Sequence, residues 1–246
     1  MRYKLLVEYD GTAYHGWQLQ PHGRTVQGVL EEALATLLRT PTRIQAAGRT
    51  DAGVHALGQV AIFDCAGPRD PRETRKALNA LTPRDVAIRE VTAVADDFDP
   101  RRHAASRVYE YRIWNQPWPS AFYHRLTWWV PRALDIRAMR LAAAALAGEH
   151  DFSAFRAADC EAESPVRRVL HSGVTEAENL IVYRIQATAF LKHMVRAIVG
   201  TLVEIGGRGL PPGAMAEILA SRDRGRAGAT APARGLTLMA VEYRAS

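Results

Sequence analysis

An order of structural elements that occurs twice along the chain most constrains its fold. Between Tyr3 and Tyr9, apolar side chains alternate with other residues at the two-residue period of a strand. Asp70 and Pro71 form the pattern that begins a helix, a capping side chain followed by proline at the first helical position. The first half is expected to contain strands at about residues 3–9, 43–46, 57–63 and 86–94, and helices at about residues 25–39 and 70–81. Its predicted order is therefore strand, helix, strand, strand, helix, strand.

The second half repeats this order of elements without repeating the sequence. Strands are expected at about residues 107–114, 166–175, 180–190 and 236–243, and helices at about 135–148, 194–205 and, briefly, after Pro211 and Pro212. Gly206 and Gly207 are expected to end the helix before them, because glycine commonly follows a helix C-terminus. The stretch 222–235, rich in Arg, Gly and Ala, is expected to be a mobile surface loop. The pattern predicts an α+β fold of two split β-α-β halves, residues 1–105 and 106–246, ferredoxin-like in element order with antiparallel or mixed sheets.

The charge of the chain is compatible with a polyanionic partner but does not by itself establish one. Its 246 residues carry a formal net charge of +6, and basic side chains neutralise phosphates. Of the 32 basic residues only Lys4, Lys76 and Lys192 are lysines. Two explanations of this arginine bias are open, the base composition of the genome and the bidentate contact that arginine makes with phosphate. Cys65 and Cys160 are too few for a disulfide scaffold and lack the spacing of a zinc ligand pair, which indicates a reducing compartment. The amino terminus lacks the apolar core of a signal peptide and no run is long enough to span a bilayer, so a cytoplasmic protein without a membrane partner is expected.

Missing motifs exclude several classes of enzyme. Gly11 and Gly16 have the spacing of a phosphate-binding loop, but Trp17 stands where that loop needs lysine, and no GxGxxG sequence follows an expected strand. The chain has no GxSxG for a serine nucleophile, no HExxH and no paired-cysteine zinc signature. Its eight histidines are scattered, and a place in the core or at the surface is favoured over metal ligation for each of them. No nucleotide cofactor and no metal are therefore expected.

The loop around Asp51 is the strongest candidate for chemistry. The stretch AAGRTDAGVHALGQV, residues 46–60, places this carboxylate between Gly48 and Gly53, beside Arg49 and Thr50. Glycine permits unusual backbone angles and the close approach of a ligand. Two interpretations are open, a reactive turn and a structural Arg-Asp turn that pins two strands, and composition alone favours the structural turn. A nearby arginine favours the ionised form of a carboxylate, which suits a nucleophile or a base.

Tyr109 and Arg196 are further candidates, and each has a structural alternative. Tyr109 offers a ring on which a base could stack, and the alternative is a half-buried tyrosine of a strand. Arg196 lies on the polar side of an expected helix, and the alternative is a solvated charge. A glycosidase would need two carboxylates that face one bond, whereas only Asp51 is suitably placed.

Seven segments occur in order between Tyr9 and Tyr243. They are YDGTAYHGWQLQ, AGRTDAGVHALGQV, ASRVYEYRIWN, GEHDFSAF, SPVRRV, AFLKHMVRAIVG and ARGLTLMAVEY. In this order they resemble the TruA-type family of tRNA pseudouridine synthases. The resemblance implies a cofactor-free isomerase that converts uridines 38, 39 and 40 of the tRNA anticodon stem-loop to pseudouridine. It also implies a homodimer whose subunits have two α/β halves around a central basic cleft.

The same resemblance assigns roles to the candidate residues. Asp51 matches the catalytic aspartate of the family, and Arg49 matches the arginine two positions before it. Tyr109 matches the active-site tyrosine, and Arg196 matches the basic residue of the HMVR segment. Arg49 is expected to occupy the space left by a flipped base or to hold a phosphate, Tyr109 to stack on that base, and Arg196 to keep Asp51 ionised.

Three roles for Asp51 and two alternative functions are left open. The carboxylate attacks C1′ of the uridine, attacks C6, or removes the C2′ proton, and the sequence does not separate these steps. The alternative functions are a pseudouridine synthase that acts on another RNA and a non-catalytic RNA-binding module.

Overall fold

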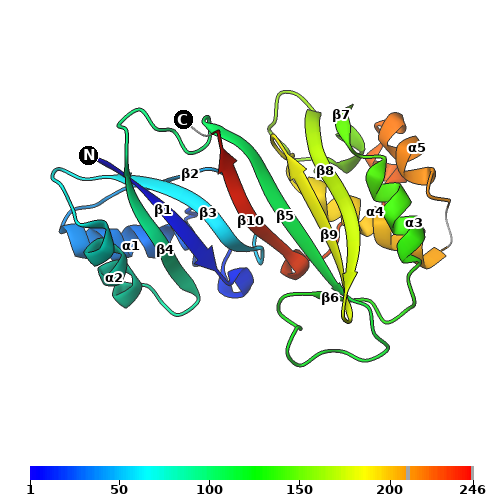
Figure 1. Ribbon diagram of the computed structural model, residues 1–246, viewed down its shortest axis with the longest axis horizontal. Coiled ribbons are helices and arrows are strands. Elements are labelled where there is room, and N and C mark those ends of the chain that lie inside the picture. Colours follow the sequence, from blue (N-terminus) through cyan, green and yellow to red (C-terminus); the bar gives the residue numbers. More distant parts are fainter. Residues whose placement is uncertain (209–210, 245–246) are drawn as a thin grey trace. The chain divides into compact units, whose positions relative to one another are not determined.

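Ten strands and five α-helices occur among the residues that the computed structural model describes, 1–208 and 211–244, so the predicted α+β class is confirmed (Figure 1). The strands are β1 (Arg2–Tyr9), β2 (Gln45–Ala46), β3 (His55–Asp64), β4 (Val86–Val94), β5 (Ala104–Trp114), β6 (Trp128–Trp129), β7 (Gly148–Asp151), β8 (Val166–Ala177), β9 (Leu180–Ala187) and β10 (Leu236–Tyr243). The helices are α1 (Val26–Leu38), α2 (Pro71–Leu81), α3 (Ile136–Ala144), α4 (Met194–Arg208) and α5 (Ala214–Ser221). No helix in the described ranges is long and apolar enough to cross a membrane.

Contacts between residues divide the chain into two compact units. Unit 1 consists of Met1–Ala105 and Thr237–Ser246, and unit 2 consists of Ser106–Leu236. The last strand, which the sequence analysis groups with the second half, lies in unit 1 because β10 pairs in parallel with the first residues of β3.

The sheet of unit 1 contains the strand order β4, β1, β3, and β2 pairs with Ala61 and Ile62 in the second half of β3. Each of these pairs is antiparallel. The side chains of Tyr3, Leu5, Val7 and Tyr9 are all buried, as the alternation along β1 predicts. Helices α1 and α2 contact each other and lie side by side in Figure 1, and α2 also packs against β4. The core of this unit therefore lies between one face of the sheet and the two helices.

Both helices of unit 1 begin where the sequence predicts. The Thr25 side chain accepts a hydrogen bond from the Gly28 backbone N–H at 3.2 Å and so caps α1. The Asp70 carboxylate accepts from the Glu73 backbone N–H at 2.9 Å and caps α2, whose first residue is Pro71. Each cap satisfies a backbone donor that the first turn of a helix leaves without an intrahelical partner.

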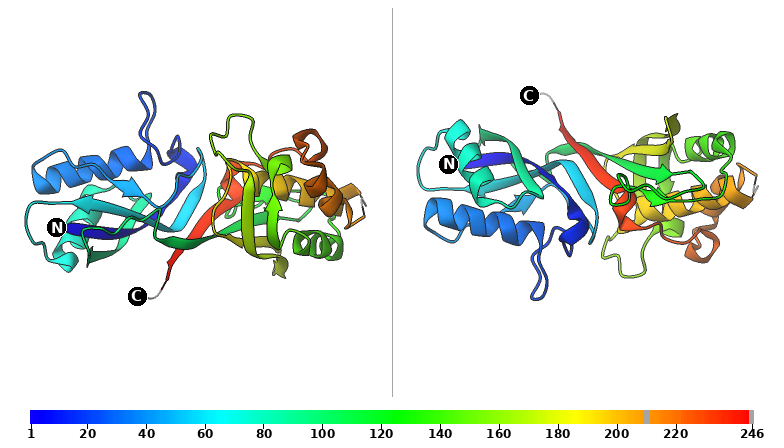
Figure 2. Two further views of the ribbon diagram at one scale, coloured as in Figure 1. Left: turned by 90° about the horizontal axis from the view of Figure 1, so that it is seen from above. Right: turned by 90° about the horizontal axis from the view of Figure 1, so that it is seen from below.

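The sheet of unit 2 has the order β5, β9, β8, β7, and each neighbouring pair is antiparallel. Strand β6 pairs in parallel with the end of β5. The predicted hairpin of β8 and β9 and the Asp135 cap of α3 are confirmed. Helix α3 packs against β8, and α3, α4 and α5 contact one another beside this sheet (Figure 2). Strands β6 and β7 are not among the predicted strands, because two and four residues are too few to show a period.

The predicted end of the fourth helix is wrong. Helix α4 continues through Gly206 and Gly207 to Arg208. A Cβ at Gly206 would lie 2.9 Å from Sδ of Met139, and a Cβ at Gly207 would lie 2.4 Å from Nε of Arg132. The glycine pair therefore lets neighbouring parts of unit 2 approach the helix closely, and it does not stop the helix.

The stretch 222–235, predicted as a mobile surface loop, has exposed residues but also two short 3-10 helices, Arg224–Arg226 and Ala233–Gly235. Gly228, Ala231 and Gly235 are buried. The Arg224 guanidinium donates to the backbone carbonyl of Gly228 at 3.1 Å and to the Thr230 hydroxyl at 3.0 Å. Small residues therefore allow the part of this segment from Gly228 to Gly235 to pack closely, while Arg222, Asp223 and Arg226 are exposed.

Candidate active site

Asp51 lies at the start of a tight turn between β2 and β3 in unit 1. The Val54 backbone N–H donates to the Asp51 carbonyl at 3.1 Å and closes the turn. Gly53 stands at the third position of the turn with a φ of +77°, which glycine adopts without steric cost. The Asp51 side chain is half-buried and the Arg49 side chain is exposed. The glycine-flanked turn that the sequence predicts around Asp51 is therefore present in the structure.

The segment from Tyr14 to Trp17 holds the main chain of this turn. The Trp17 backbone N–H donates to the Thr50 carbonyl at 3.0 Å, and the Gly53 backbone N–H donates to the Tyr14 carbonyl at 3.3 Å. Gly16 has a φ of +89°, and a Cβ there would lie 2.7 Å from the Thr50 carbonyl oxygen. Glycine at this position therefore lets two segments that are far apart in the sequence lie in direct contact.

Two side chains from the strands fix the residues on either side of Arg49. The hydroxyls of Tyr9 and Thr50 are 2.8 Å apart and share a buried hydrogen bond. The Gln59 side-chain amide donates to the Gly48 carbonyl at 2.8 Å. Burial raises the pKa of Tyr9 to about 12, although hydrogen bonds with Thr50 and Gln59 offset part of the rise, so the phenol is protonated at neutral pH.

The Tyr14 side chain anchors the supporting segment to the end of unit 1 where β4 begins. Its hydroxyl donates to the Asp85 carboxylate at 2.6 Å, and the Arg24 guanidinium lies 4.8 Å from the centre of its ring. Burial, together with the negative charge of Asp85, raises the pKa of Tyr14. The hydroxyl therefore stays protonated and acts as the donor to the carboxylate.

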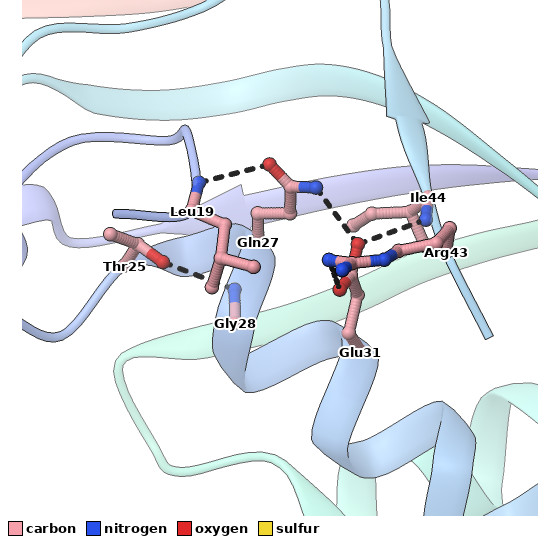
Figure 3. A network of polar contacts seen from close by, with 7 residues as sticks. All are labelled: Leu19, Thr25, Gln27, Gly28, Glu31, Arg43 and Ile44. Carbon is pink, nitrogen blue, oxygen red and sulfur yellow. Dashed lines mark hydrogen bonds and ion pairs between the residues drawn. The ribbon is translucent and has the colours of Figure 1, made fainter. Parts of the chain in front are cut away.

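Glu31 on α1 links the segment that follows Trp17 to the segment that precedes β2 and the Asp51 turn (Figure 3). One carboxylate oxygen accepts from the Gln27 side chain at 2.8 Å and from the Ile44 backbone N–H at 3.2 Å. The other oxygen pairs with the Arg43 guanidinium at 2.9 Å. Gln27 in turn accepts from the Leu19 backbone N–H at 3.0 Å. One side chain thus holds the segment after Trp17 and the segment before β2 on the same helix.

Asp51 and Arg49 were predictable from the sequence, whereas the side chains that position them were not among the predicted site residues. Tyr9, Tyr14 and Gln59 lie in the quoted segments YDGTAYHGWQLQ and AGRTDAGVHALGQV, so the signal was present in the sequence. Their function as supports follows only from the contacts, because the partners are 11 to 71 residues apart in the chain.

Tyr109 lies in unit 2, on β5, directly opposite Ile185 of β9. Its side chain is half-buried, and its ring meets the Phe190 ring edge to face, with centroids 5.0 Å apart and an angle of 83° between the planes. Phe190 therefore fixes the orientation of the phenol ring, as stacking on a base would require.

Arg196 also lies in unit 2, in the first turns of α4, and its side chain is half-buried. Its Nε donates to the Ala231 carbonyl at 2.8 Å, and its own carbonyl accepts from the Ala231 backbone N–H at 3.1 Å. The alternative of a merely solvated charge is therefore wrong for this arginine. A guanidinium is a fork of donors that suits a carboxylate or a phosphate.

The described residues offer no site for a metal ion. Across 1–208 and 211–244, no group of three or more His, Cys, Asp or Glu side chains is arranged to hold one. The most buried histidine, His55, has a structural role instead, since its Nδ1 accepts from the Gly11 backbone N–H at 3.0 Å. The structure thus places Arg49 and Asp51 together on one turn and Tyr109 and Arg196 in unit 2, and the common action of all four residues stays a prediction.

Comparison with known families identifies the class of protein. A family model described as tRNA pseudouridine synthase matches residues 5–101 and 142–244. These ranges contain the Asp51 turn, the residues that support it and Arg196, whereas Tyr109 lies between the two ranges. The chain belongs to the tRNA pseudouridine synthase family, which is a family of isomerases.

Bacterial relatives named tRNA pseudouridine synthase A are similar over almost the whole chain. The protein from Myxococcus xanthus is 48% identical over 99% of this chain and 92% of its own length. The protein from Paramagnetospirillum magneticum is 48% identical over 100% of this chain and 96% of its own length. The protein from Geotalea daltonii is 45% identical over 98% of both chains.

Proposed function

We propose that this chain isomerises uridine to pseudouridine in tRNA, at positions 38, 39 and 40 of the anticodon stem-loop. The observation that carries the proposal is Asp51, presented on a turn whose main chain is held on both sides, in a chain of this family. The names of the relatives support tRNA as the substrate. The three positions in the anticodon arm rest on the resemblance of the seven ordered segments.

The proposed reaction rearranges one nucleoside without any co-reactant. The N1–C1′ bond of uridine breaks, a C5–C1′ bond forms, C5 loses a proton and N1 gains one. The base must leave the helical stack before these bonds are accessible, and flipping costs a few kcal/mol. Basic side chains that contact phosphates offset this cost, which agrees with the net charge of +6.

The proposed roles follow the residues one at a time. Asp51 attacks C1′ or C6 of the flipped uridine or removes its C2′ proton. Tyr109 stacks on the base, a contact of about 1 to 3 kcal/mol in complexes with nucleic acids. Arg49, which is exposed, fills the vacated space or holds a phosphate, and Arg196 keeps Asp51 ionised.

Release of tritium from C5 of uridine in an anticodon stem-loop tests the proposal. Asp51→Asn keeps the shape of the side chain and is expected to slow release by at least about a thousandfold, as loss of a nucleophile or base does in other enzymes. Asp64→Asn, at the opposite end of β3, is the matched control and is expected to release tritium at the wild-type rate. Release by Asp51→Asn at the wild-type rate would remove Asp51 from the mechanism.

Two alternative functions give different results in the same assay. A non-catalytic RNA-binding module would bind the stem-loop and release no tritium with either protein. A pseudouridine synthase for another RNA would leave the anticodon stem-loop unmodified, and mapping pseudouridine in total RNA after incubation would locate its substrate. The family match favours the tRNA enzyme over both.

The wider architecture of the enzyme is part of the same proposal. The element order and the antiparallel strand order of unit 1 support two ferredoxin-like halves, and the charge of the chain supports a basic cleft that binds tRNA. We infer a homodimer that acts in the cytoplasm from the resemblance to the family. Analytical ultracentrifugation of the purified protein measures the oligomeric state directly.

A further inference from the structure

A short segment of unit 2 bridges β5 and α4, because its backbone groups form hydrogen bonds with residues of both elements. We call residues 228–235 the strap. The Gly228 backbone N–H donates to the Thr201 hydroxyl of α4 at 2.9 Å. The Ala231 backbone N–H donates to the Arg196 carbonyl at 3.1 Å, and the Tyr111 hydroxyl of β5 donates to the Pro232 carbonyl at 2.7 Å. The strap is therefore attached to α4 at its start and middle and to β5 near its end.

Glycines leave the strap no room to shift. A Cβ on Gly200 of α4 would lie 1.7 Å from the Ala229 carbonyl oxygen, and a Cβ on Gly228 would lie 2.8 Å from the Gly200 carbonyl carbon. A Cβ on Gly235 would lie 2.5 Å from the Tyr111 ring. The backbone of the strap thus lies in direct contact with the helix on one side and the tyrosine ring on the other.

Two adjacent carbonyl groups of the strap have two different partners. The Ala231 carbonyl accepts from Nε of Arg196 at 2.8 Å, and the next carbonyl, of Pro232, accepts from the Tyr111 hydroxyl. A planar peptide bond joins the two residues, and the proline ring fixes φ, here −55°. Only one rotation, ψ of Pro232 (143°), is left between the two carbonyl groups, so a displacement of one restricts the positions open to the other.

We propose that Tyr111 is a positioning residue for Arg196, which it orients through the Pro232 and Ala231 carbonyls of the strap. The proposal rests on the function proposed above, in which Arg196 supports Asp51. Tyr111 lies on β5 two residues after Tyr109. One strand therefore carries both the residue proposed to stack on the base, Tyr109, and the residue proposed to orient Arg196, Tyr111.

The state of the Tyr111 hydroxyl agrees with this role. Burial raises the pKa of Tyr111, while the positive charges of Arg196 and Arg234 oppose the rise. The hydroxyl is therefore protonated at neutral pH and donates to the Pro232 carbonyl.

Tyr111→Phe tests the proposal because it removes one hydroxyl and keeps the ring. We expect kcat for tritium release to fall about tenfold with KM within about twofold, since a small misplacement of a catalytic group lowers kcat. Tyr183→Phe is the matched control. Tyr183 faces Tyr111 across the β5–β9 pair, is equally buried, and makes one hydroxyl bond of 2.9 Å to Ser172. Because this hydrogen bond involves Ser172 and no residue of the strap, kcat of Tyr183→Phe is expected to stay at the wild-type value.

A second measurement reads the position of Arg196 without activity. The Nε–H of Arg196 gives a side-chain signal in nitrogen-15 NMR, which is assigned by its loss in Arg196→Lys. Its hydrogen exchange is expected to be at least about fivefold faster in Tyr111→Phe than in wild type, and unchanged in Tyr183→Phe, because opening of the strap exposes this donor.

A double variant separates a positioning role from a general loss of stability. If Tyr111 acts through Arg196, then Tyr111→Phe should change kcat less than about 1.5-fold in an Arg196→Lys background. Equal kcat and equal exchange in Tyr111→Phe and Tyr183→Phe would overturn the proposal, as would an undiminished effect in the Arg196→Lys background. If the wild-type protein releases no tritium, the proposed function fails, and the exchange measurement alone then decides whether Tyr111 orients Arg196.

Discussion

Replacement of Gly16 by alanine perturbs the Asp51 turn without touching any candidate catalytic side chain. The φ of +89° is a region that residues with a Cβ adopt at a cost of about 1 to 2 kcal/mol. The new Cβ would lie 2.7 Å from the Thr50 carbonyl oxygen and 3.1 Å from the Ala52 nitrogen. Both neighbours are backbone atoms, so the turn must move, and overpacking of this kind costs about 1 to 3 kcal/mol. Gly16→Ala is therefore expected to lower the free energy of unfolding by about 2 to 5 kcal/mol.

Urea unfolding and thermal melting measure this loss. For a chain of this size each kcal/mol lowers the melting temperature by about 2 to 4 °C, so the expected decrease is about 4 to 20 °C. Gly67→Ala, in the same unit, is the matched control because a Cβ there has no heavy atom within 4 Å. The control is expected to stay within about 0.5 kcal/mol of wild type.

Tritium release by the same two variants tests the link to function. At a temperature where both are folded, Gly16→Ala is expected to be about 10- to 100-fold slower, because the Thr50 carbonyl that must move directly precedes Asp51. Gly67→Ala is expected to match wild type. If Gly16→Ala unfolds together with the control and releases tritium at the wild-type rate, the segment from Tyr14 to Trp17 does not hold the turn in its working geometry.

Two further predictions concern the hydrogen bond below the turn. Thr50→Val leaves the buried Tyr9 hydroxyl without this partner, so it should lower the free energy of unfolding by about 1 to 3 kcal/mol and slow tritium release. Thr50→Ser retains the hydroxyl and should keep the wild-type stability and rate. Equal losses in the two variants would contradict a role for the Thr50 hydroxyl. The pKa of Tyr9, about 12 in the folded protein, is above its ordinary value near 10, so its stabilising contribution is complete below pH 10 and is lost as the pH rises from 10 to 12. Urea titrations across that interval should show a smaller loss in Tyr9→Phe than in wild type, and identical curves would refute the assignment.

Two of the seven sequence segments that carry the resemblance are parts of one structural feature. YDGTAYHGWQLQ supplies Tyr9, Tyr14 and Gly16, which contact the backbone or hydroxyl of residues in AGRTDAGVHALGQV. The first segment therefore has a physical reason to keep its glycine and its tyrosines, although it contributes no candidate nucleophile. Loss of either segment would leave the other without its contacts.

Part of the candidate site could be predicted from the sequence. The glycines around Asp51 and the arginine beside it are local in the chain, and the turn has the form that their order predicts. The support by Tyr9 and Tyr14 could not be predicted, because it depends on which strands pair and in which register. The role that we propose for Tyr111 depends on a segment that looks like a loose linker in the sequence and packs tightly in the fold.

The sequence by itself determined the helix starts, the strand alternation and the order of the elements. A cap such as Asp70 binds a backbone donor three residues away, and the alternation along β1 needs only one covered face, so neighbours in the chain supply the information. Only the tertiary structure decided that Gly206 and Gly207 continue a helix and that Gly228 lies against Thr201. Glycine allows both a helix end and a close contact, and the side chain or backbone that packs against it selects between them.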